Sequence, residues 1–249
     1  MQSLEGRRIL VTGASGGLGR SISALLAGLG ARCVIQGRNP AKLKSLVESL
    51  PSSGHIAFQG TLQKSDDFVK LLDFAVDGLG GVDGVVHAMG KHVLSPVRSL
   101  TPAQIEEVFS ANVYSAFYLS QAFRRKSVPK IGGSIVFLSS VTGSYGQAGI
   151  SAYAASKGAI NALTKSLAVE LAAEGIRVNA IASGAVNTGM TLALQETYKG
   201  IFDDALAEKH LLGLGEAEDI AWMAAFLLSQ SSKWITGSIM PVDGGYTAQ

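Results

Sequence analysis

Tyr153 and Lys157 are the residues whose types and spacing are best suited to chemistry. They bound the segment Tyr-Ala-Ala-Ser-Lys, and helical spacing would place their side chains one turn apart on one face. A free tyrosine hydroxyl titrates at about pH 10, and a neighbouring ammonium group lowers that pKa by stabilising the phenolate. Tyr153 is therefore a candidate general acid or base. An aromatic anchor followed by a solvated lysine gives the same pattern, so the motif alone does not decide.

A glycine-rich turn near the N-terminus indicates a phosphate-binding site. The apolar run from Arg8 to Val11 leads through Thr12 into the glycine turn Gly13–Gly19, and a helical pattern begins at about Gly17. Glycines let the backbone approach a phosphate closely, and a helix N-terminus supplies free N–H groups. A tight turn without a ligand is the alternative. The strand before the turn and the helix after it favour a dinucleotide pyrophosphate.

The turn after the next strand-like run, Ala31–Gln36, indicates which dinucleotide binds. A site for the non-phosphorylated cofactor needs a carboxylate about 20 residues past the glycines to hold the ribose diol. The sequence has no Asp or Glu between Glu5 and Glu48, whereas Arg38 lies where a ribose 2′-phosphate would bind. A solvent-facing loop arginine is the alternative. The pattern predicts NADP(H), with Arg20 as a candidate second positive charge.

The composition excludes several classes of protein. The 249 residues are 47% hydrophobic and 16% charged, with no linker-like shift in composition, which is typical of one globular domain. The net charge is only +2 and the basic residues are scattered, so nucleic-acid binding is not expected. The four histidines show no metal-ligand spacing, so no metal site is expected.

Cysteine content and the apolar stretches bear on the compartment. Cys33 is the only cysteine, which excludes an internal disulfide. Polar residues interrupt the long uncharged stretches, so no membrane span is expected. The first ten residues lack the apolar core of a signal peptide. We therefore expect a cytoplasmic protein.

Predicted strands and helices alternate along the chain. The strands are Arg8–Val11, Ala31–Gln36, His55–Gln59, Val82–Ala88, Ser134–Ser139, Ile176–Ile181 and Ser238–Val242, and the helices are Gly17–Gly30, Ser65–Leu79, Pro102–Arg125, Ser151–Ala173 and Ala217–Leu228. This alternation indicates parallel βαβ units. The predicted fold class is α/β: residues 1–249 form a single Rossmann-type domain, a doubly wound parallel sheet of about seven strands with helices on both faces.

With these elements placed, the chain resembles the short-chain dehydrogenase/reductase family nearly end to end. The turn Thr12–Gly19 matches the family's Thr-Gly-x-x-x-Gly-x-Gly, and Tyr153 with Lys157 matches its Tyr-x-x-x-Lys. Ser140 stands thirteen residues before Tyr153, the family's usual interval for its catalytic serine, and Asn112 matches its helix asparagine. Three further segments match family signatures: Val178–Thr188, Ile235–Gly237 and Val242–Gly245.

The resemblance implies a catalytic tetrad of Asn112, Ser140, Tyr153 and Lys157. Ser140 is then expected to donate a hydrogen bond to the substrate carbonyl, and Tyr153 to deliver the proton. Lys157 is expected to hold the nicotinamide ribose and to depress the tyrosine pKa, while Asn112 positions a water linked to Lys157. Cofactor contacts are expected from Gly13, Ser15, Gly17, Leu18, Gly19, Arg38, Leu62, Gly90, Tyr153, Lys157, Gly184, Val186 and Thr188.

Three positions depart from the family pattern. His87-Ala-Met-Gly90 replaces the usual Asn-Asn-Ala-Gly, and His87 is expected to be a satisfied core histidine rather than a catalyst. Ser183 replaces the usual proline, which is expected to loosen the loop that follows. Thr61 stands near the position of the family's adenine-contacting aspartate, which leaves that contact to the backbone of Leu62.

The substrate is less well defined. The resemblance places a substrate flap at about residues 186–215. Its apolar side chains, which favour a substrate with a hydrophobic portion or serve simple packing, are Met190, Leu192, Leu194, Tyr198, Ile201 and Phe202. The first candidate activity is reduction of a 3-oxoacyl group, as in 3-oxoacyl-[acyl-carrier-protein] reductases, or of a similar ketone, with acyl thioesters among the substrates. The alternatives are a dehydrogenase of another secondary alcohol and a non-catalytic dinucleotide sensor.

The helix Ser151–Ala173 also predicts self-association. It carries more small residues than packing on one sheet face requires: Ala154, Ala155, Gly158, Ala159 and Ala162. The family commonly pairs this helix and its asparagine-bearing neighbour across a two-fold axis. The resemblance therefore implies a homotetramer or homodimer.

Overall fold

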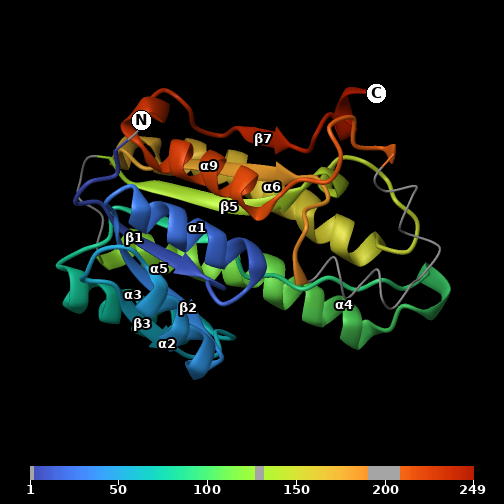
Figure 1. The fold of residues 1–249 in the computed structure, drawn as a ribbon. Helices are drawn as coiled ribbons and strands as arrows, with labels where there is room; N and C mark the ends of the chain where they lie inside the picture. Colours follow the sequence, from blue (N-terminus) through green and yellow to red (C-terminus); the bar gives the residue numbers. More distant parts are fainter. Residues whose placement is uncertain (1–2, 127–131, 190–207) are drawn as a thin grey trace.

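Seven parallel strands form one sheet in the computed structural model, which describes residues 3–126, 132–189 and 208–249 (Figure 1). The strands are β1 (Arg8–Thr12), β2 (Arg32–Gly37), β3 (Ile56–Gln59), β4 (Gly84–His87), β5 (Ser134–Ser140), β6 (Arg177–Ser183) and β7 (Ile239–Val242). Their order across the sheet is β3-β2-β1-β4-β5-β6-β7. The fold class predicted from the sequence is confirmed.

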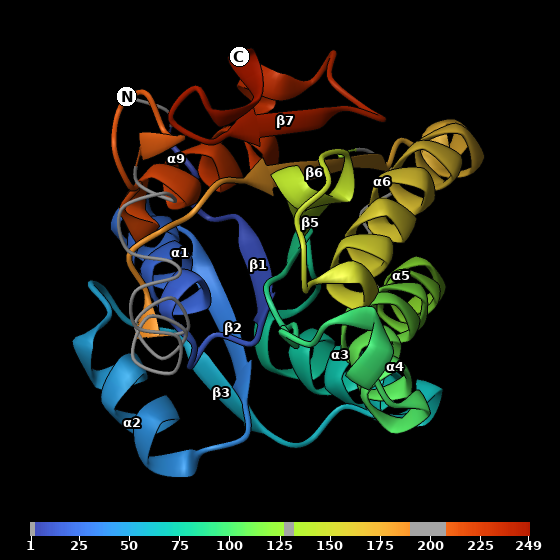
Figure 2. The same ribbon diagram turned by 90° about the vertical axis from the view of Figure 1, so that its right-hand side faces the viewer.

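Helices cover both faces of this sheet, as Figure 2 shows. One face carries α1 (Gly17–Gly28), α2 (Pro40–Ser49) and α9 (Ala217–Leu228); the other carries α3 (Ser65–Leu79), α4 (Pro102–Phe109), α5 (Ser115–Lys126) and α6 (Ser151–Leu171). No helix in the described part of the chain is long and apolar enough to span a bilayer.

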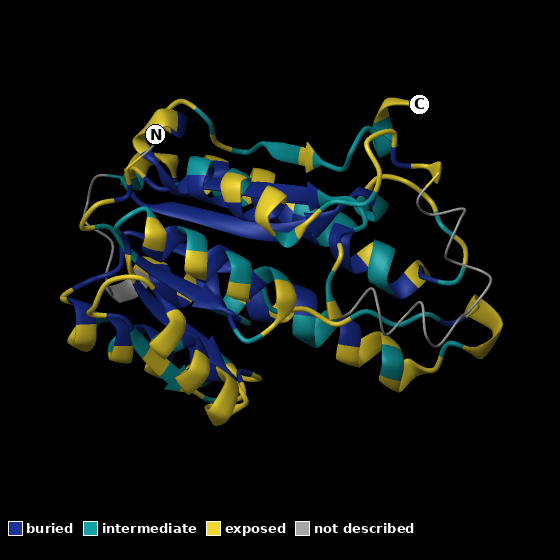
Figure 3. Ribbon diagram, viewed as in Figure 1, coloured by how far each residue is buried: buried dark blue, intermediate teal, exposed yellow. Residues whose placement is uncertain are grey.

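Successive residues of the central strands supply two separate cores. In β5, Val136 packs with α1 and α9, whereas Ile135 and Phe137 on either side of it pack with α3, α5 and α6. All three side chains are fully buried. The central strands β4 and β5 therefore lack polar alternation, because both of their faces are covered. Figure 3 shows the same arrangement: the central strands are buried between helices whose outer faces are exposed, and the edge strand β7 is only partly buried.

The helix α2 is not predicted from the sequence. Asn39 is the N-cap of α2 and accepts a hydrogen bond from the Lys42 backbone N at 3.0 Å, and Pro40 takes the first helical position. Both are favourable start signals. Only Leu43 and Leu46 are buried along the helix, however. Its apolar stripe is too short to produce a clear helical period.

The predicted helix Pro102–Arg125 is divided in the structure. A π-helical turn, Ser110–Tyr114, separates α4 from α5. Such turns insert one extra residue into a helix and occur often at functional sites. Asn112 lies within this turn and is almost fully buried.

The strand order locates the ligand-binding edge of the sheet. β1 pairs with β2 on one side and with β4 on the other, so the connections leave these two neighbouring strands in opposite directions. In open α/β sheets ligands bind outside the carboxyl ends of the strands at such a switch point. The last residues of β1 and β4, Thr12 and His87, are paired in register there.

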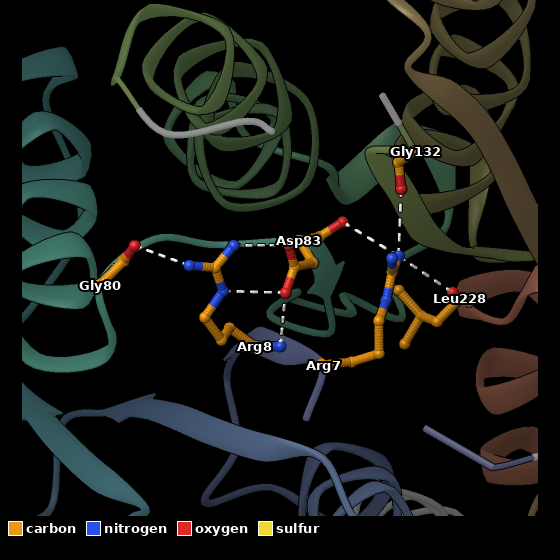
Figure 4. A network of polar contacts seen from close by, with 6 residues as sticks. All are labelled: Arg7, Arg8, Gly80, Asp83, Gly132 and Leu228. Atoms are coloured by element: carbon orange, nitrogen blue, oxygen red, sulfur yellow. Dashed lines mark hydrogen bonds and ion pairs between the residues drawn. The ribbon is translucent and has the colours of Figure 1, made fainter. Parts of the chain in front are cut away.

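Polar contacts fasten the opposite ends of β1 and β4 (Figure 4). The Arg8 guanidinium donates from Nε to Asp83 Oδ2 at 2.9 Å and from Nη2 to Oδ1 at 2.7 Å, and the Arg8 backbone N donates to Oδ2 at 2.9 Å. Arg7 donates to the carbonyls of Gly132 and Leu228 at 3.0 and 3.4 Å. These arginines join β1 to the starts of β4 and β5 and to the end of α9.

The Asp83 carboxylate makes this contact sensitive to pH. Burial raises the pKa of Asp83, but hydrogen bonds from Arg8 and the charges of Arg8 and Arg7 outweigh burial and hold the pKa below its ordinary value. A carboxyl group with a depressed pKa stabilises the fold above its unfolded-state pKa of about 4. That contribution is lost as the pH falls through the lower folded-state pKa.

We expect Asp83→Ala to lower the free energy of unfolding at pH 7 by about 2–3 kcal/mol, because three charge-assisted hydrogen bonds are lost and Arg8 keeps partial solvent access. Denaturant titrations at pH 7 and pH 3 measure this, and the difference from wild type should shrink at pH 3. Lys44→Gln is the control, since its ion pair with Glu48 is solvent-exposed and contributes less than about 1 kcal/mol. An equal loss at both pH values would contradict the ionic origin.

Candidate active site

The four predicted catalytic side chains meet at the carboxyl ends of β4 and β5. Tyr153 and Lys157 lie in the first two turns of α6, with Lys157 Nζ 5.5 Å from the Tyr153 ring centroid. Ser140 ends β5 and hydrogen-bonds Tyr153. Asn112 and Lys157 both approach Gly90, where an added Cβ would lie 3.1 Å from Asn112 Oδ1 and 3.8 Å from Lys157 Nζ. Gly90 thus leaves room for both polar groups.

Lys157 is buried and directed at a backbone carbonyl. Its Nζ donates to the Leu138 carbonyl oxygen at 2.7 Å, and its own carbonyl accepts from Ser139 Oγ at 3.3 Å. These contacts hold α6 against the end of β5. Burial lowers the pKa of Lys157 to about 8, because the ammonium group loses its hydration. The side chain remains mostly charged at neutral pH.

The pKa of Tyr153 moves opposite to the expectation from the sequence. Burial raises it to about 12, and the hydrogen bond with Ser140 offsets only part of this rise. The lowered pKa predicted for Tyr153 is wrong for this structure, because burial dominates the shift. Lys157 Nζ lies over the Tyr153 ring and donates to the Leu138 carbonyl. Tyr153 therefore holds its proton at neutral pH, which suits a donor to a developing alkoxide.

The environment of Ser140 makes its hydroxyl a donor. Ser140 Oγ accepts hydrogen bonds from the Thr142 backbone N at 3.2 Å and from Thr142 Oγ1 at 3.0 Å. A hydroxyl has one proton and two acceptor positions, so both acceptor positions are filled. The proton of Ser140 is left to point toward Tyr153 or toward a substrate carbonyl.

Asn112 clamps the loop that follows β4. Its Oδ1 accepts from the Lys91 backbone N at 2.7 Å, and its Nδ2 donates to the Lys91 carbonyl at 3.0 Å and to Ser156 Oγ at 2.8 Å. The π-helical turn, the loop and α6 are joined through this one side chain. An amide oxygen has a second acceptor position, so the predicted water contact of Asn112 stays a prediction.

The glycine turn passes close to the loop after β4. Gly13 has a φ of +67°, and an added Cβ would lie 2.7 Å from the Met89 backbone N. Gln36, at the end of β2, supports the turn from below: its Oε1 accepts from the Gly13 backbone N at 3.0 Å and its Nε2 donates to the Gly60 carbonyl at 2.7 Å. Only a residue without a side chain fits at Gly13.

The start of α1 suits an anion. Gly16 is the N-cap without a side-chain hydrogen bond, and the first turn, which includes Gly17, Leu18 and Gly19, contains no acidic residue. The helix N-terminus thus presents N–H groups and the positive end of its dipole. An added Cβ on Gly17 would lie 2.9 Å from Thr188 Cβ, so the glycine admits Thr188 beside the turn. These residues fit the pyrophosphate of a dinucleotide.

Arg38 lies at the far side of this turn. It directly follows β2, is exposed, and no described residue bonds its guanidinium. Ser15 lies next to the end of β2, since an added Cβ on Gly37 would be 2.8 Å from Ser15 Oγ. The arginine therefore borders the glycine turn. Leu62, the predicted adenine contact, follows β3, and its side chain is buried in the core.

The segment after β6 is held at both ends of the predicted flap. Val186 forms an isolated parallel bridge with Gly215, and the Ala185 backbone N donates to His210 Nε2 at 3.0 Å. Gly184 allows close packing, because an added Cβ would lie 2.8 Å from Asp243 Cα. The apolar flap residues Met190, Leu192, Leu194, Tyr198, Ile201 and Phe202 lie outside the described residues.

Ser183, where the family usually has proline, belongs to β6 and donates to the Ser139 carbonyl at 3.4 Å. The loosening predicted for the following loop therefore does not begin at Ser183.

His87 is a satisfied core histidine, as the sequence predicts. Ser115 Oγ donates to the Ala111 carbonyl at 2.7 Å, so it accepts from His87 Nε2 at 2.9 Å; His87 Nδ1 then accepts from Thr12 Oγ1 at 2.9 Å. Burial and the charge of Lys157 lower the pKa of His87 to about 3. The ring is neutral and, through Ser115 at the start of α5, links the end of β1 to Ala111 in the π-helical turn.

Two polar residues near the site were not predicted to take part in it. Gln36 supports the glycine turn, and its signal in the sequence is only a polar residue ending an apolar strand. His92 packs on Tyr153, with ring centroids 4.5 Å apart, and no motif marks it. In the described part of the chain, no group of three or more His, Cys, Asp or Glu side chains is arranged to hold a metal ion.

Comparisons with known proteins agree with this geometry. A family model described as enoyl-(acyl carrier protein) reductase matches residues 13–247. A gluconate 5-dehydrogenase of Gluconobacter oxydans is 32% identical over 253 residues, which cover 98% of this chain and 96% of the relative. A 3-oxoacyl-[acyl-carrier-protein] reductase of Vibrio cholerae is 34% identical over 244 residues, which cover 98% of each chain.

A solved structure with the same fold matches nearly the whole chain. It is a short chain dehydrogenase from Burkholderia cenocepacia in complex with NADP, 30% identical, with a TM-score of 0.90; the match covers 98% of this chain and 99% of that one. The relatives differ in the substrates that their names give. The substrate of this chain must therefore be argued from its own residues.

Proposed function

Because this chain belongs to the short-chain dehydrogenase/reductase family, we propose that it transfers a hydride between NADP(H) and a carbonyl or secondary alcohol. The preferred reaction is reduction of a 3-oxoacyl group or a similar ketone. The observation that carries this proposal is the meeting of protonated Tyr153, the donor Ser140 and charged Lys157 at one strand edge. The glycine turn faces the same edge.

The nicotinamide cofactor, when bound, supplies the hydride; the chain's own residues supply orientation and the proton. Ser140 donates a hydrogen bond to the substrate carbonyl oxygen, and Tyr153 donates its proton there as negative charge develops. Lys157 adds positive charge in a site with little water, where electrostatic stabilisation is strong. The start of α1 would hold the pyrophosphate of the cofactor, and Arg38 would hold the ribose 2′-phosphate. Gly90 and Lys157 would border the nicotinamide ribose.

Two other functions remain as testable alternatives. A dehydrogenase acting on a different secondary alcohol is favoured by the likeness to a gluconate 5-dehydrogenase, and it would use the same residues in the reverse direction. A sensor that binds the dinucleotide without turnover needs no proton donor. The convergence of Tyr153, Ser140 and Lys157 argues against the sensor, and assays with ketones and alcohols separate the three.

We expect Tyr153→Phe to lower kcat by roughly 10²–10⁴-fold, because it removes the proton donor and keeps the ring. Cofactor affinity, followed by fluorescence titration with NADPH, should stay within a few-fold of wild type. Tyr145→Phe is the matched control, since the Tyr145 hydroxyl donates to the Thr247 carbonyl. A Tyr153→Phe enzyme within a few-fold of wild type would remove Tyr153 from the role of proton donor.

We also propose that NADPH is preferred over NADH. Arg38 can offer its planar guanidinium to a 2′-phosphate, and a charge-assisted hydrogen bond contributes about 1.5–3 kcal/mol, or roughly 10- to 100-fold in affinity. Arg38→Gln should raise the KM for NADPH by that factor and leave the KM for NADH nearly unchanged. Lys44→Gln on α2 controls for general loss of positive charge. Equal kcat/KM for both cofactors in the wild-type enzyme would contradict the assignment.

Finally, we propose a homotetramer or homodimer that pairs α6 and its neighbours. The helices α5 and α6 lie side by side in Figure 2. Ala155 and Ala162 are exposed on α6; Phe117 on α5 is 44% exposed, and Tyr114 at the end of the π-helical turn is 40% exposed. Phe117→Glu should shift the mass measured by light scattering toward a smaller species while the circular dichroism spectrum is kept. Val97→Glu, at an exposed site elsewhere, should not. A monomeric wild-type protein at micromolar concentration would refute the proposal.

A further inference from the structure

His92 carries a buried nitrogen without a hydrogen-bond partner. Its Nδ1 is shielded from solvent, and no described residue bonds it. Leaving a buried polar atom unsatisfied costs about 1–3 kcal/mol, so such an atom in a folded protein requires an explanation. His87, five residues earlier, has both ring nitrogens bonded. The contrast points to a partner for His92 outside the chain.

The position of His92 is fixed beside the proton donor. The centroids of its ring and the Tyr153 ring are 4.5 Å apart, with an angle of 52° between the planes. The backbone before it is held by the hydrogen bonds of Asn112 to Lys91. The backbone after it is held where the Ser95 N donates to the Gly149 carbonyl at 2.7 Å. The loop that carries His92 is thus anchored on both sides, and it holds the imidazole against the Tyr153 ring.

The charge state of His92 limits what it can recognise. Burial lowers the pKa of His92, and the charge of Lys157 lowers it further. The ring is therefore neutral at pH 7 and does not serve as a cationic site for a carboxylate or phosphate. A neutral imidazole nitrogen instead forms one directional hydrogen bond, as donor or as acceptor according to the tautomer.

We propose that His92 Nδ1 hydrogen-bonds a second oxygen atom of the substrate, carried one or two carbons from the carbonyl that Tyr153 protonates. The inference rests on the proposed function, because it places the reacting carbonyl at Tyr153. Since the two rings are in contact, the two oxygen atoms they bind must be close together in the substrate. The substrate class is then an oxygenated ketone rather than a simple one.

Two kinds of molecule share this chemistry. A hydroxy ketone brings a hydroxyl, which can donate to or accept from Nδ1 and so fits either tautomer. A 3-oxoacyl ester or thioester brings a second carbonyl, which only accepts and so requires the proton on Nδ1. A ketone without a second oxygen would leave the buried nitrogen unsatisfied, and the site would discriminate against it.

The test compares matched ketones with the full-length enzyme and NADPH. Hydroxyacetone is paired with butanone, in which a methyl group replaces the hydroxyl. Methyl acetoacetate is paired with 2-hexanone, in which methylene groups replace the ester carbonyl and the ester oxygen and the chain length is kept. Two variants separate hydrogen bonding from packing. His92→Phe keeps an aromatic ring against Tyr153 and removes both nitrogens, whereas His92→Asn loses the ring and keeps polar atoms on Cγ, where Nδ1 is attached.

We expect wild type to prefer the oxygenated member of at least one pair. His92→Phe should reduce that preference, the ratio of the two kcat/KM values, by about 10-fold, and His92→Asn should retain most of it. A change confined to the first pair identifies a hydroxyl as the ligand, and one confined to the second identifies a carbonyl.

An unchanged ratio in His92→Phe for both pairs would overturn the inference and leave the proposed function standing, because His92 would then act by packing alone. The inference is likewise overturned if His92→Asn loses the preference as fully as His92→Phe. If wild type reduces none of the four ketones and oxidises none of the matching alcohols with either cofactor, the proposed function itself fails, and this inference with it.

Discussion

The hydrogen bonds of the Asn112 side chain to both backbone groups of Lys91 are the contact on which the site depends. They attach the loop after β4 to the π-helical turn, and a further bond to Ser156 attaches the same turn to α6. The loop carries Gly90, and α6 carries Tyr153, the proposed proton donor. Asn112 thus fixes the π-helical turn, the loop after β4 and α6 relative to one another, although these elements are distant in sequence. The π-helical geometry directs the asparagine inward at the place where all three meet.

Burial sets the electrostatics of the site. It raises the pKa of Tyr153 to about 12 and lowers that of Lys157 to about 8, because low polarity disfavours the charged form of each group. The site therefore holds one positive charge and one transferable proton. In the proposed reaction, both features would assist the substrate carbonyl oxygen as negative charge develops on it. The same low polarity strengthens the attraction between that oxygen and Lys157.

Sequence patterns predict the parts of this molecule that depend on local order. Buried strands, the glycine turn at Gly13 and the helical pair on α6 each follow from a repeating pattern or a fixed spacing. The helix α2 is not predicted, because only Leu43 and Leu46 are buried along it and two apolar positions do not define a helical period. The direction of the Tyr153 pKa shift is not predicted either, because it depends on burial in the folded chain. Spacing along a helix does not specify how deeply the hydroxyl is buried.

His87 and His92 show how far residue type alone can lead. Both rings are neutral, the charge of Lys157 lowers the pKa of each, and only four residues separate them in the sequence. His87 completes a chain of hydrogen bonds from β1 to the π-helical turn, so its role is finished within the fold. His92 Nδ1 is equally removed from water yet has no partner among the described residues. Folding stability alone would favour an apolar ring at this position, so the nitrogen is better explained by what binds next to Tyr153.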